Sequence, residues 1–144
     1  MLDSRLVGYW SDEPLYQGDM EFADVAFRAD WTGWTYWCNA AGAFEVVRFS
    51  WQGNGPVLHL HLREYVAGTW SLNGGKLTHQ LTDRSGEDQL ISLAYEIIAG
   101  QNATGDPATL LQFDQSVIRG VVGDRFALKR ELAINERDPG YDSE

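Results

Sequence analysis

Short segments in which apolar and polar residues alternate make up most of this chain. Clusters of Gly, Asn and Asp interrupt them roughly every 8–12 residues, the spacing of antiparallel sandwiches and barrels. No stretch combines a cap with apolar residues at helical spacing. The pattern predicts an all-β fold, with candidate strands at residues 5–10, 20–29, 34–38, 43–51, 56–64, 69–72, 77–82, 89–98, 109–114, 116–122 and 125–132.

The predicted hairpins divide the side chains of the first strands between two faces, because directly opposed residues point to the same side. Four-residue loops at 30–33, 39–42 and 52–55 are assumed. One face then collects Val25, Phe27, Trp34, Tyr36, Cys38, Val47, Phe49, Trp51, Leu58, Leu60 and Leu62. The other collects Arg28, Thr35, Asn39, Arg48, His59, His61 and Arg63. Trp37 is the apolar exception on the polar face, where it predicts a partner surface or a homodimer contact.

The second half of the chain continues this pattern. A turn at 73–76 pairs Leu72 with Leu77 and Trp70 with His79. Alternation places Ile91, Leu93, Tyr95 and Ile97 inward, and groups Phe126, Leu128, Arg130 and Leu132 on one side of the last strand. Without an internal repeat or a linker, residues 1–134 are expected to form one domain. Residues 135–144, which carry four acids, Pro139 and Gly140, are expected to form a disordered acidic tail.

Charge and composition exclude several classes of protein. The 144 residues carry a net charge of −10, which argues against nucleic acid as a partner. One cysteine, Cys38, rules out an intramolecular disulfide and a zinc site built on several thiolates. No apolar run is long enough to span a membrane, and no signal peptide is visible. We therefore expect a cytoplasmic protein.

Short motifs in the first half of the chain resemble those of the lipocalin and fatty-acid-binding-protein (calycin) superfamily. Gly8-Tyr9-Trp10 matches its Gly-x-Trp signature. The segment from Phe27 to Trp34 is similar to the F-x-x-D-G-T-G hairpin of small bacterial lipocalin-like domains, with Trp31 in place of the first Gly. Phe49-Ser50-Trp51 and Gly68-Thr69-Trp70 also fit that pattern. Together the matches cover residues 6–75.

The resemblance implies an up-and-down antiparallel β-barrel of about 8–10 strands that holds a small apolar ligand. In such families the Gly-x-Trp tryptophan packs beneath a cation, a place that Arg130, Lys129 or Arg119 would take here. The Thr-Asp-Tyr motif and the paired cysteines of secreted lipocalins are absent. The haem motif Gly-x-Trp-x-Gly-x-Gly is absent too, because Ser11-Asp12-Glu13 follow Trp10. No cofactor is therefore predicted.

Eight residues are candidates for contact with the ligand: Trp34, Tyr36, Glu45, Trp70, His79, Tyr95, Arg119 and Arg130. The predicted register places Glu45 on the apolar face, where an ionised carboxylate is costly unless it is paired. It is either a cavity acid or a rim carboxylate in water. Arg119 and Arg130 lie on otherwise apolar sides of their strands and would pair with a ligand carboxylate or support Trp10. The aromatic residues would line a pocket or simply fill the barrel.

His59 and His61 point to one side of a strand, as metal ligands do. The face analysis places them on the polar side, so solvent-facing histidines are favoured over a metal site. Cys38 has no activating base nearby and is expected to be an inert buried thiol.

Three functions are consistent with the sequence. The first is binding of a small hydrophobic molecule, with or without a carboxylate or carbonyl group, in the barrel interior. The second is an isomerase or cyclase in which Glu45, Tyr36 and His79 supply acid and base groups. The third is an interaction module without a ligand.

Overall fold

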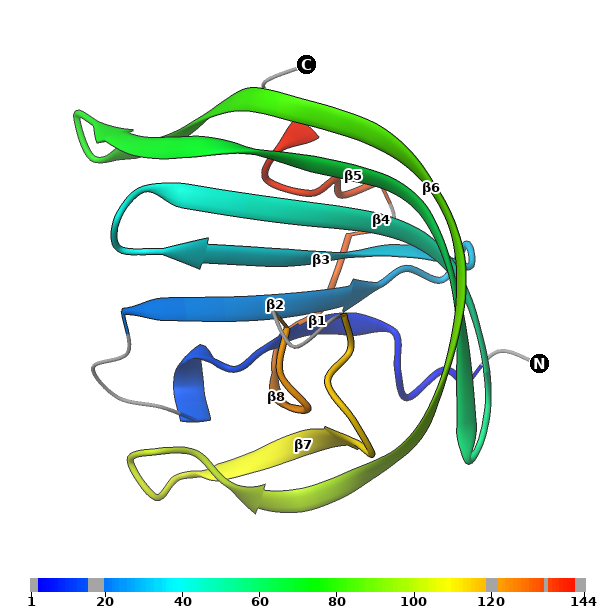
Figure 1. Cartoon of the computed structure of the whole chain (residues 1–144). Helices are drawn as coiled ribbons and strands as arrows, with labels where there is room; N and C mark the ends of the chain where they lie inside the picture. The colour runs from blue at the N-terminus through cyan, green and yellow to red at the C-terminus, as the bar shows by residue number, and fades with distance from the viewer. Residues whose placement is uncertain (1–2, 16–19, 119–121, 134, 142–144) are drawn as a thin grey trace.

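Eight antiparallel strands, each paired with the next, form a closed barrel (Figure 1). The computed structural model describes residues 3–15, 20–118, 122–133 and 135–141. The strands are β1 (Gly8–Ser11), β2 (Glu21–Phe27), β3 (Thr32–Asn39), β4 (Ala43–Asn54), β5 (Val57–Asn73), β6 (Lys76–Gln101), β7 (Pro107–Phe113) and β8 (Arg125–Arg130). A short 3₁₀ helix, η1 (Glu13–Leu15), follows β1. The prediction of an all-β, up-and-down antiparallel barrel is confirmed.

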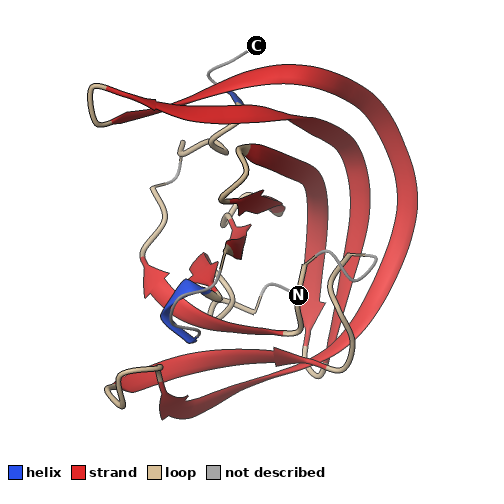
Figure 2. Ribbon diagram, turned by 60° about the vertical axis from the view of Figure 1, so that its left-hand side comes forward, coloured by secondary structure: helices blue, strands red, loops and turns tan. Residues whose placement is uncertain are grey.

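A long hairpin of β5 and β6 explains why fewer strands are observed than the candidate segments suggested. Residues 83–88, where a break between strands is predicted, pair with β5, with Asp83 opposite Ala67 and Gly86 opposite Glu64. Register shifts on both sides of this stretch accommodate its turn-forming residues without ending the strand. Both strands curve strongly, and β6 passes around one side of the molecule to reach β7 (Figure 2). The described ends of the predicted strand at 116–122 meet in a bridge between Ile118 and Val122, and residues 119–121 lie outside the described residues.

An inner cluster of buried side chains fills much of the barrel. Seven of the eight strands contribute to it, and Trp10 is among its most deeply buried members. The Trp10 indole N–H donates a hydrogen bond to the Leu6 carbonyl oxygen at 2.9 Å. The cluster comprises Leu6, Trp10, Ala23, Val25, Phe27, Val47, Phe49, Trp51, Leu58, Leu60, Leu62, Leu93, Tyr95, Leu111, Phe113, Val117, Ile118, Val122 and Phe126.

An outer cluster of buried side chains covers the other face of β1–β5. It comprises Tyr9, Ala26, Trp34, Tyr36, Cys38, Phe44, Val46 and Val66. Both faces of this part of the sheet are therefore buried. Burial on both faces explains why the apolar residues of β3 follow one another (Trp34-Thr35-Tyr36-Trp37-Cys38) and do not alternate cleanly with polar ones.

The β2–β3 connection corrects the predicted face of β3. The Arg28 amide N–H donates to the Thr32 carbonyl oxygen at 2.8 Å, so the loop begins earlier than expected and Phe27 pairs with Gly33. This odd shift in register turns every β3 side chain to the opposite face. Trp34, Tyr36 and Cys38, predicted inside, therefore lie in the outer cluster.

A second odd shift restores the predicted faces of the following strands. Cys38 pairs with Phe44 where Ala43 was expected. The inward placement of Val47, Phe49 and Trp51 is therefore correct, as is that of Leu58, Leu60 and Leu62 on β5.

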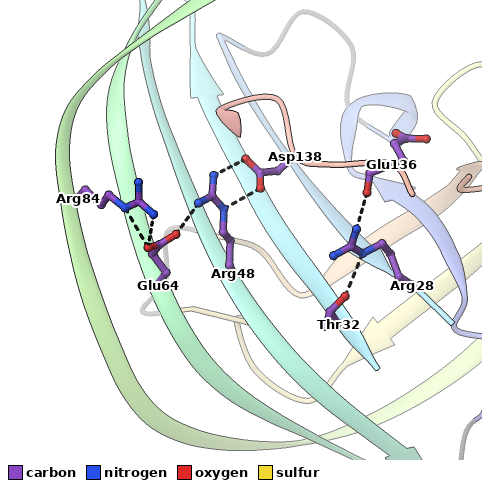
Figure 3. A network of polar contacts seen from close by, with 7 residues as sticks. All are labelled: Arg28, Thr32, Arg48, Glu64, Arg84, Glu136 and Asp138. Atoms are coloured by element: carbon purple, nitrogen blue, oxygen red, sulfur yellow. Dashed lines mark hydrogen bonds and ion pairs between the residues drawn. The ribbon is translucent and has the colours of Figure 1, made fainter. Parts of the chain in front are cut away.

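The segment 135–141, expected to be part of a disordered tail, lies against the outside of the barrel. Arg28 donates to the carbonyl oxygen of Glu136 at 2.8 Å, and Arg48 binds both carboxylate oxygens of Asp138 (Figure 3). Asp138 is buried as a result. Its position follows from contacts of residues 136 and 138 with specific arginines on the barrel, which its composition alone does not reveal.

Candidate functional site

A partly enclosed cavity of about 340 Å³ adjoins the inner cluster between β3, β4, β5, β6 and the segment around Ile118. Its lining is mostly apolar, with a few polar groups at defined positions. The lining residues are Trp37, Glu45, Val47, Leu62, Tyr65, Ser85, Glu87, Ile118 and Val122. The volume falls within the range of small-molecule sites, about 300–1,000 Å³, and the apolar lining with few polar groups is typical of them.

Glu45 and Tyr65 form the polar centre of this cavity, which we call the Glu45 cavity. They lie on neighbouring strands, β4 and β5, and the Tyr65 hydroxyl donates to Glu45 Oε1 at 2.9 Å. Burial, the bond to Glu45 and nearby carboxylates raise the pKa of Tyr65 to about 12, so the hydroxyl stays protonated at neutral pH. Glu45 Oε2 accepts no hydrogen bond from the described residues and is available to a ligand donor.

The charge of the lining determines which ligands suit the cavity. Glu45 and Glu87 are the two ionisable acids, and no cation lines the cavity among the described residues. These two carboxylates would repel a ligand carboxylate. A group that donates hydrogen bonds would instead find an acceptor in Glu45.

Trp37 lies on the inner side of β3, which corrects its predicted place on the outer polar face. It pairs with Glu45, packs against the inner cluster and lines the Glu45 cavity. The Trp37 indole N–H donates to Glu21 at 3.2 Å. The register that places Tyr36 on the outer face places Trp37 on the inner face. Trp37 therefore does not support a dimer contact.

Four of the predicted ligand contacts lie outside the barrel. Trp34 and Tyr36 belong to the outer cluster, and Trp70 packs against it. The predicted pairing of Trp70 with His79 is correct, but this pair lies on the outer side of the sheet. The Trp70 indole N–H donates to the carbonyl oxygen of Asn39 at 2.9 Å.

Tyr95 lies in the inner cluster as predicted, away from the Glu45 cavity. Its hydroxyl donates to Asp3 Oδ2 at 2.6 Å. Burial, together with the Asp3 carboxylate, raises the pKa of Tyr95 to about 12. Tyr95 thus anchors the segment before β1.

Arg130 does not reach the interior, contrary to its predicted position. A register shift between Tyr9 and Trp10 places Arg130 opposite Tyr9, and its guanidinium lies 4.3 Å from the Tyr9 ring centre on the outer face. It also forms an ion pair with Glu136 at 2.6 Å. Lys129, another candidate partner of Trp10, pairs with Glu13 on the surface. The remaining candidate, Arg119, lies outside the described residues.

Tyr36 and His79 form a hydrogen-bonded pair, with 2.7 Å between the hydroxyl and Nε2. The His79 ring also packs edge-on against Phe44. Glu45 faces the opposite side of the sheet, so the three groups proposed for acid–base chemistry do not share a site. Burial raises the pKa of the Cys38 thiol to about 11, so it remains protonated at neutral pH.

Asp24 is a buried carboxyl group that the sequence pattern does not predict. It is 2% exposed and accepts a hydrogen bond from the Tyr9 hydroxyl, and its Oδ1 has no partner among the described residues. Burial raises the pKa of Asp24, although hydrogen bonds from Ser11 and Tyr9 oppose this shift. Alternation with Val25 and Phe27 places Asp24 on the outer face of β2, but the outer cluster that buries this face was not predicted.

The effect of Asp24→Asn on stability is expected to depend on pH. Because its pKa is raised, Asp24 contributes most stability below its ordinary pKa of 3.8, and this contribution is lost as pH rises through the folded-state pKa. Asparagine does not titrate. The stability of the wild type relative to the variant should therefore fall as the pH rises above that ordinary value. Urea unfolding at several pH values measures this, with exposed Asp114→Asn as the control; a difference independent of pH would contradict the shift.

His59 and His61 lie on the outer side of β5, as predicted. His59 Nδ1 is 2.9 Å from the Ser92 hydroxyl, and His61 Nε2 is 2.5 Å from Asp88 Oδ1. Within the part of the chain that the structure describes, no three His, Cys, Asp or Glu side chains gather as a metal site.

The architecture defines a closed antiparallel β-barrel with a cavity at the edge of its core. Comparison with protein families, curated proteins and solved structures finds no match. No helix within residues 3–15, 20–118, 122–133 and 135–141 is long and apolar enough to cross a membrane.

Proposed function

We propose that this protein is a calycin-like barrel that binds a small, largely apolar molecule in the Glu45 cavity. The cavity itself is the observation that carries the proposal: about 340 Å³, lined mainly by apolar side chains, with one oriented carboxylate. The barrel topology and the buried Trp10 of the Gly-x-Trp motif support the calycin-like assignment.

The bound molecule carries a hydrogen-bond donor, such as an amine, amide or hydroxyl group. Tyr65 holds one oxygen of Glu45 and thereby fixes the carboxylate, while the other oxygen accepts from the ligand. Glu87 adds a second negative charge to the lining. The carboxylates of Glu45 and Glu87 favour a ligand that is neutral or cationic over one that carries a carboxylate.

A matched pair of aromatic probes tests this proposal. We expect 1-naphthylmethylamine to bind and to quench tryptophan fluorescence, because Trp37 lines the cavity, and 1-naphthoic acid to bind at least about tenfold more weakly. Glu45→Gln should remove most of the preference for the amine. Ser85→Phe, a change at an exposed lining residue, should weaken both probes by narrowing the entrance.

Two controls keep the test specific. Glu96→Gln removes an exposed acid outside the cavity and should leave both affinities unchanged. Tighter binding of the acid, or affinities insensitive to Ser85→Phe, would refute the proposal. If neither probe binds, an interaction module without a ligand becomes the better interpretation.

A further inference from the structure

A second cavity, of about 400 Å³, is lined by an unusual number of arginines. It lies where the start of β3 and the middle of β4 meet the segment 137–141 on the outside of the barrel. We call it the arginine groove; it shares no lining residue with the Glu45 cavity. Its lining residues are Arg28, Thr32, Gly33, Trp34, Arg48, Phe49, Arg63, Arg137, Asp138 and Tyr141.

The charges in this groove are not balanced. Asp138 is its single carboxylate, and both of its oxygens are held by Arg48, at 2.8 and 3.1 Å. Arg28 contacts the Glu136 carbonyl oxygen and the Thr32 hydroxyl, and its nearest carboxylate, Asp30, is 3.8 Å away on the surface. The groove therefore carries positive charge in a chain with a net charge of −10.

Arg63 and Arg137 are the groups most available to a ligand. Both are exposed, and neither forms an ion pair with a described residue. Arg63 reaches the Ser50 hydroxyl at 3.3 Å, and the guanidinium of Arg137 lies 4.1 Å from the ring centre of Tyr141. Each retains several unused N–H donors arranged as a fork.

The contact between Arg48 and Asp138 is an example of oxyanion binding by an arginine of this groove. Arg48 grips the Asp138 carboxylate with two parallel hydrogen bonds, and Glu64 and Arg84 extend the network across β5 and β6 (Figure 3). Burial alone would raise the pKa of Glu64, but hydrogen bonds from Arg48 and Arg84 hold it below its ordinary value. This network holds Arg48 in place at the base of the groove.

The local arginines outweigh the negative charge of the rest of the chain. At physiological ionic strength exposed charges are screened beyond about 8 Å, so distant carboxylates repel an anion in the groove only weakly. Guanidinium groups within hydrogen-bond distance are not screened in this way, and their planar forks match phosphate and carboxylate oxygens.

We propose that the arginine groove binds a small oxyanion with two or more negative charges, as a phosphate group or a pair of carboxylates carries. Arg63 and Arg137 bind it from the two sides of the groove, and the remaining N–H groups of Arg28 supply further donors. Because Glu45 and Glu87 disfavour such a ligand in the Glu45 cavity, we expect the two sites to select opposite chemistry.

Calorimetric titration of the full chain with inorganic pyrophosphate and with citrate tests this proposal. We expect saturable binding of at least one of them, weakened at least about tenfold in the double variant Arg63→Gln/Arg137→Gln. Both residues are exposed, so the double variant should fold, and urea unfolding verifies this. The tighter of the two anions identifies the oxyanion as phosphate or carboxylate.

Arg125→Gln and Lys76→Gln, which remove exposed cations outside the groove, serve as matched controls. Both control variants should bind pyrophosphate and citrate with the affinity of the wild type. No binding of either anion, or equal weakening by the control variants, would overturn the proposal. The naphthyl amine of the preceding test should bind the double variant normally, which separates failure of this site from failure of the Glu45 cavity.

Discussion

Replacing Arg48 with methionine is expected to lower the free energy of unfolding by about 3–5 kcal/mol. The Asp138 side chain is only 5% exposed, and Arg48 supplies both of the hydrogen bonds that its carboxylate receives in the described structure. Methionine fills much of the same space but leaves this buried charge unpaired. Removing one partner of a buried ion pair costs more than the pair itself contributes, because the remaining charge is not solvated.

Urea unfolding monitored by tryptophan fluorescence measures this loss. Arg125→Met is the matched control, since Arg125 is exposed and bonds the Gln112 side chain at the surface; a change within about 0.5 kcal/mol is expected. Adding Asp138→Asn to Arg48→Met removes the unpaired charge and should recover part of the loss. A change below about 1 kcal/mol in Arg48→Met would show that segment 135–141 contributes little to folding.

Trp10→Ala is expected to have a similarly large effect, about 3–5 kcal/mol. Trp10 is 0% exposed within the inner cluster, and its indole N–H satisfies the Leu6 carbonyl oxygen. Alanine leaves a cavity that the closed ring of strands cannot easily relax to fill. It also leaves the Leu6 carbonyl oxygen without its hydrogen-bond donor.

A second tryptophan provides the control for this prediction. Trp31 is 37% exposed and has a φ of 70°, a conformation that favours glycine. Trp31→Gly relieves this strain but loses the contact with Trp51, whose ring centre is 5.6 Å away. Its unfolding free energy should therefore change by no more than about 1 kcal/mol. Equal losses in the two variants would contradict the assignment of Trp10 as the anchor of the core.

The sequence predicts the barrel well because alternation survives where only one face of a strand is buried. On β5 and β6 the inward placement of Leu58, Leu60, Leu93 and Tyr95 is correct. Both faces of β3 are buried, so alternation does not show which of its side chains point inward. That prediction depends on the assumed loop length alone. The predicted β2–β3 register is wrong by an odd number of residues. The prediction therefore places Tyr36 inward, whereas Trp37 is the inward residue.

The candidate site was predictable only in part for the same reason. Glu45 was recognised because a carboxylate among apolar neighbours stands out, and it lines the cavity. Its partner Tyr65 was missed because it lies on β5 beyond the segment that was read as a strand. The docking of Asp138 on Arg48 joins residues far apart in the sequence, and charge pattern alone does not encode such a partner.

The closed ring also has a consequence for the order in which the chain folds. The β5–β6 hairpin joins neighbouring residues across a turn at 73–76, whereas the seam between β1 and β8 pairs Tyr9 with Arg130, near opposite ends of the chain. The entropy cost of closing a loop grows with its length, and pairings between distant residues slow folding. We therefore expect the hairpin to form early, and closure of the seam, which completes the enclosure of Trp10, to be a late and slow step.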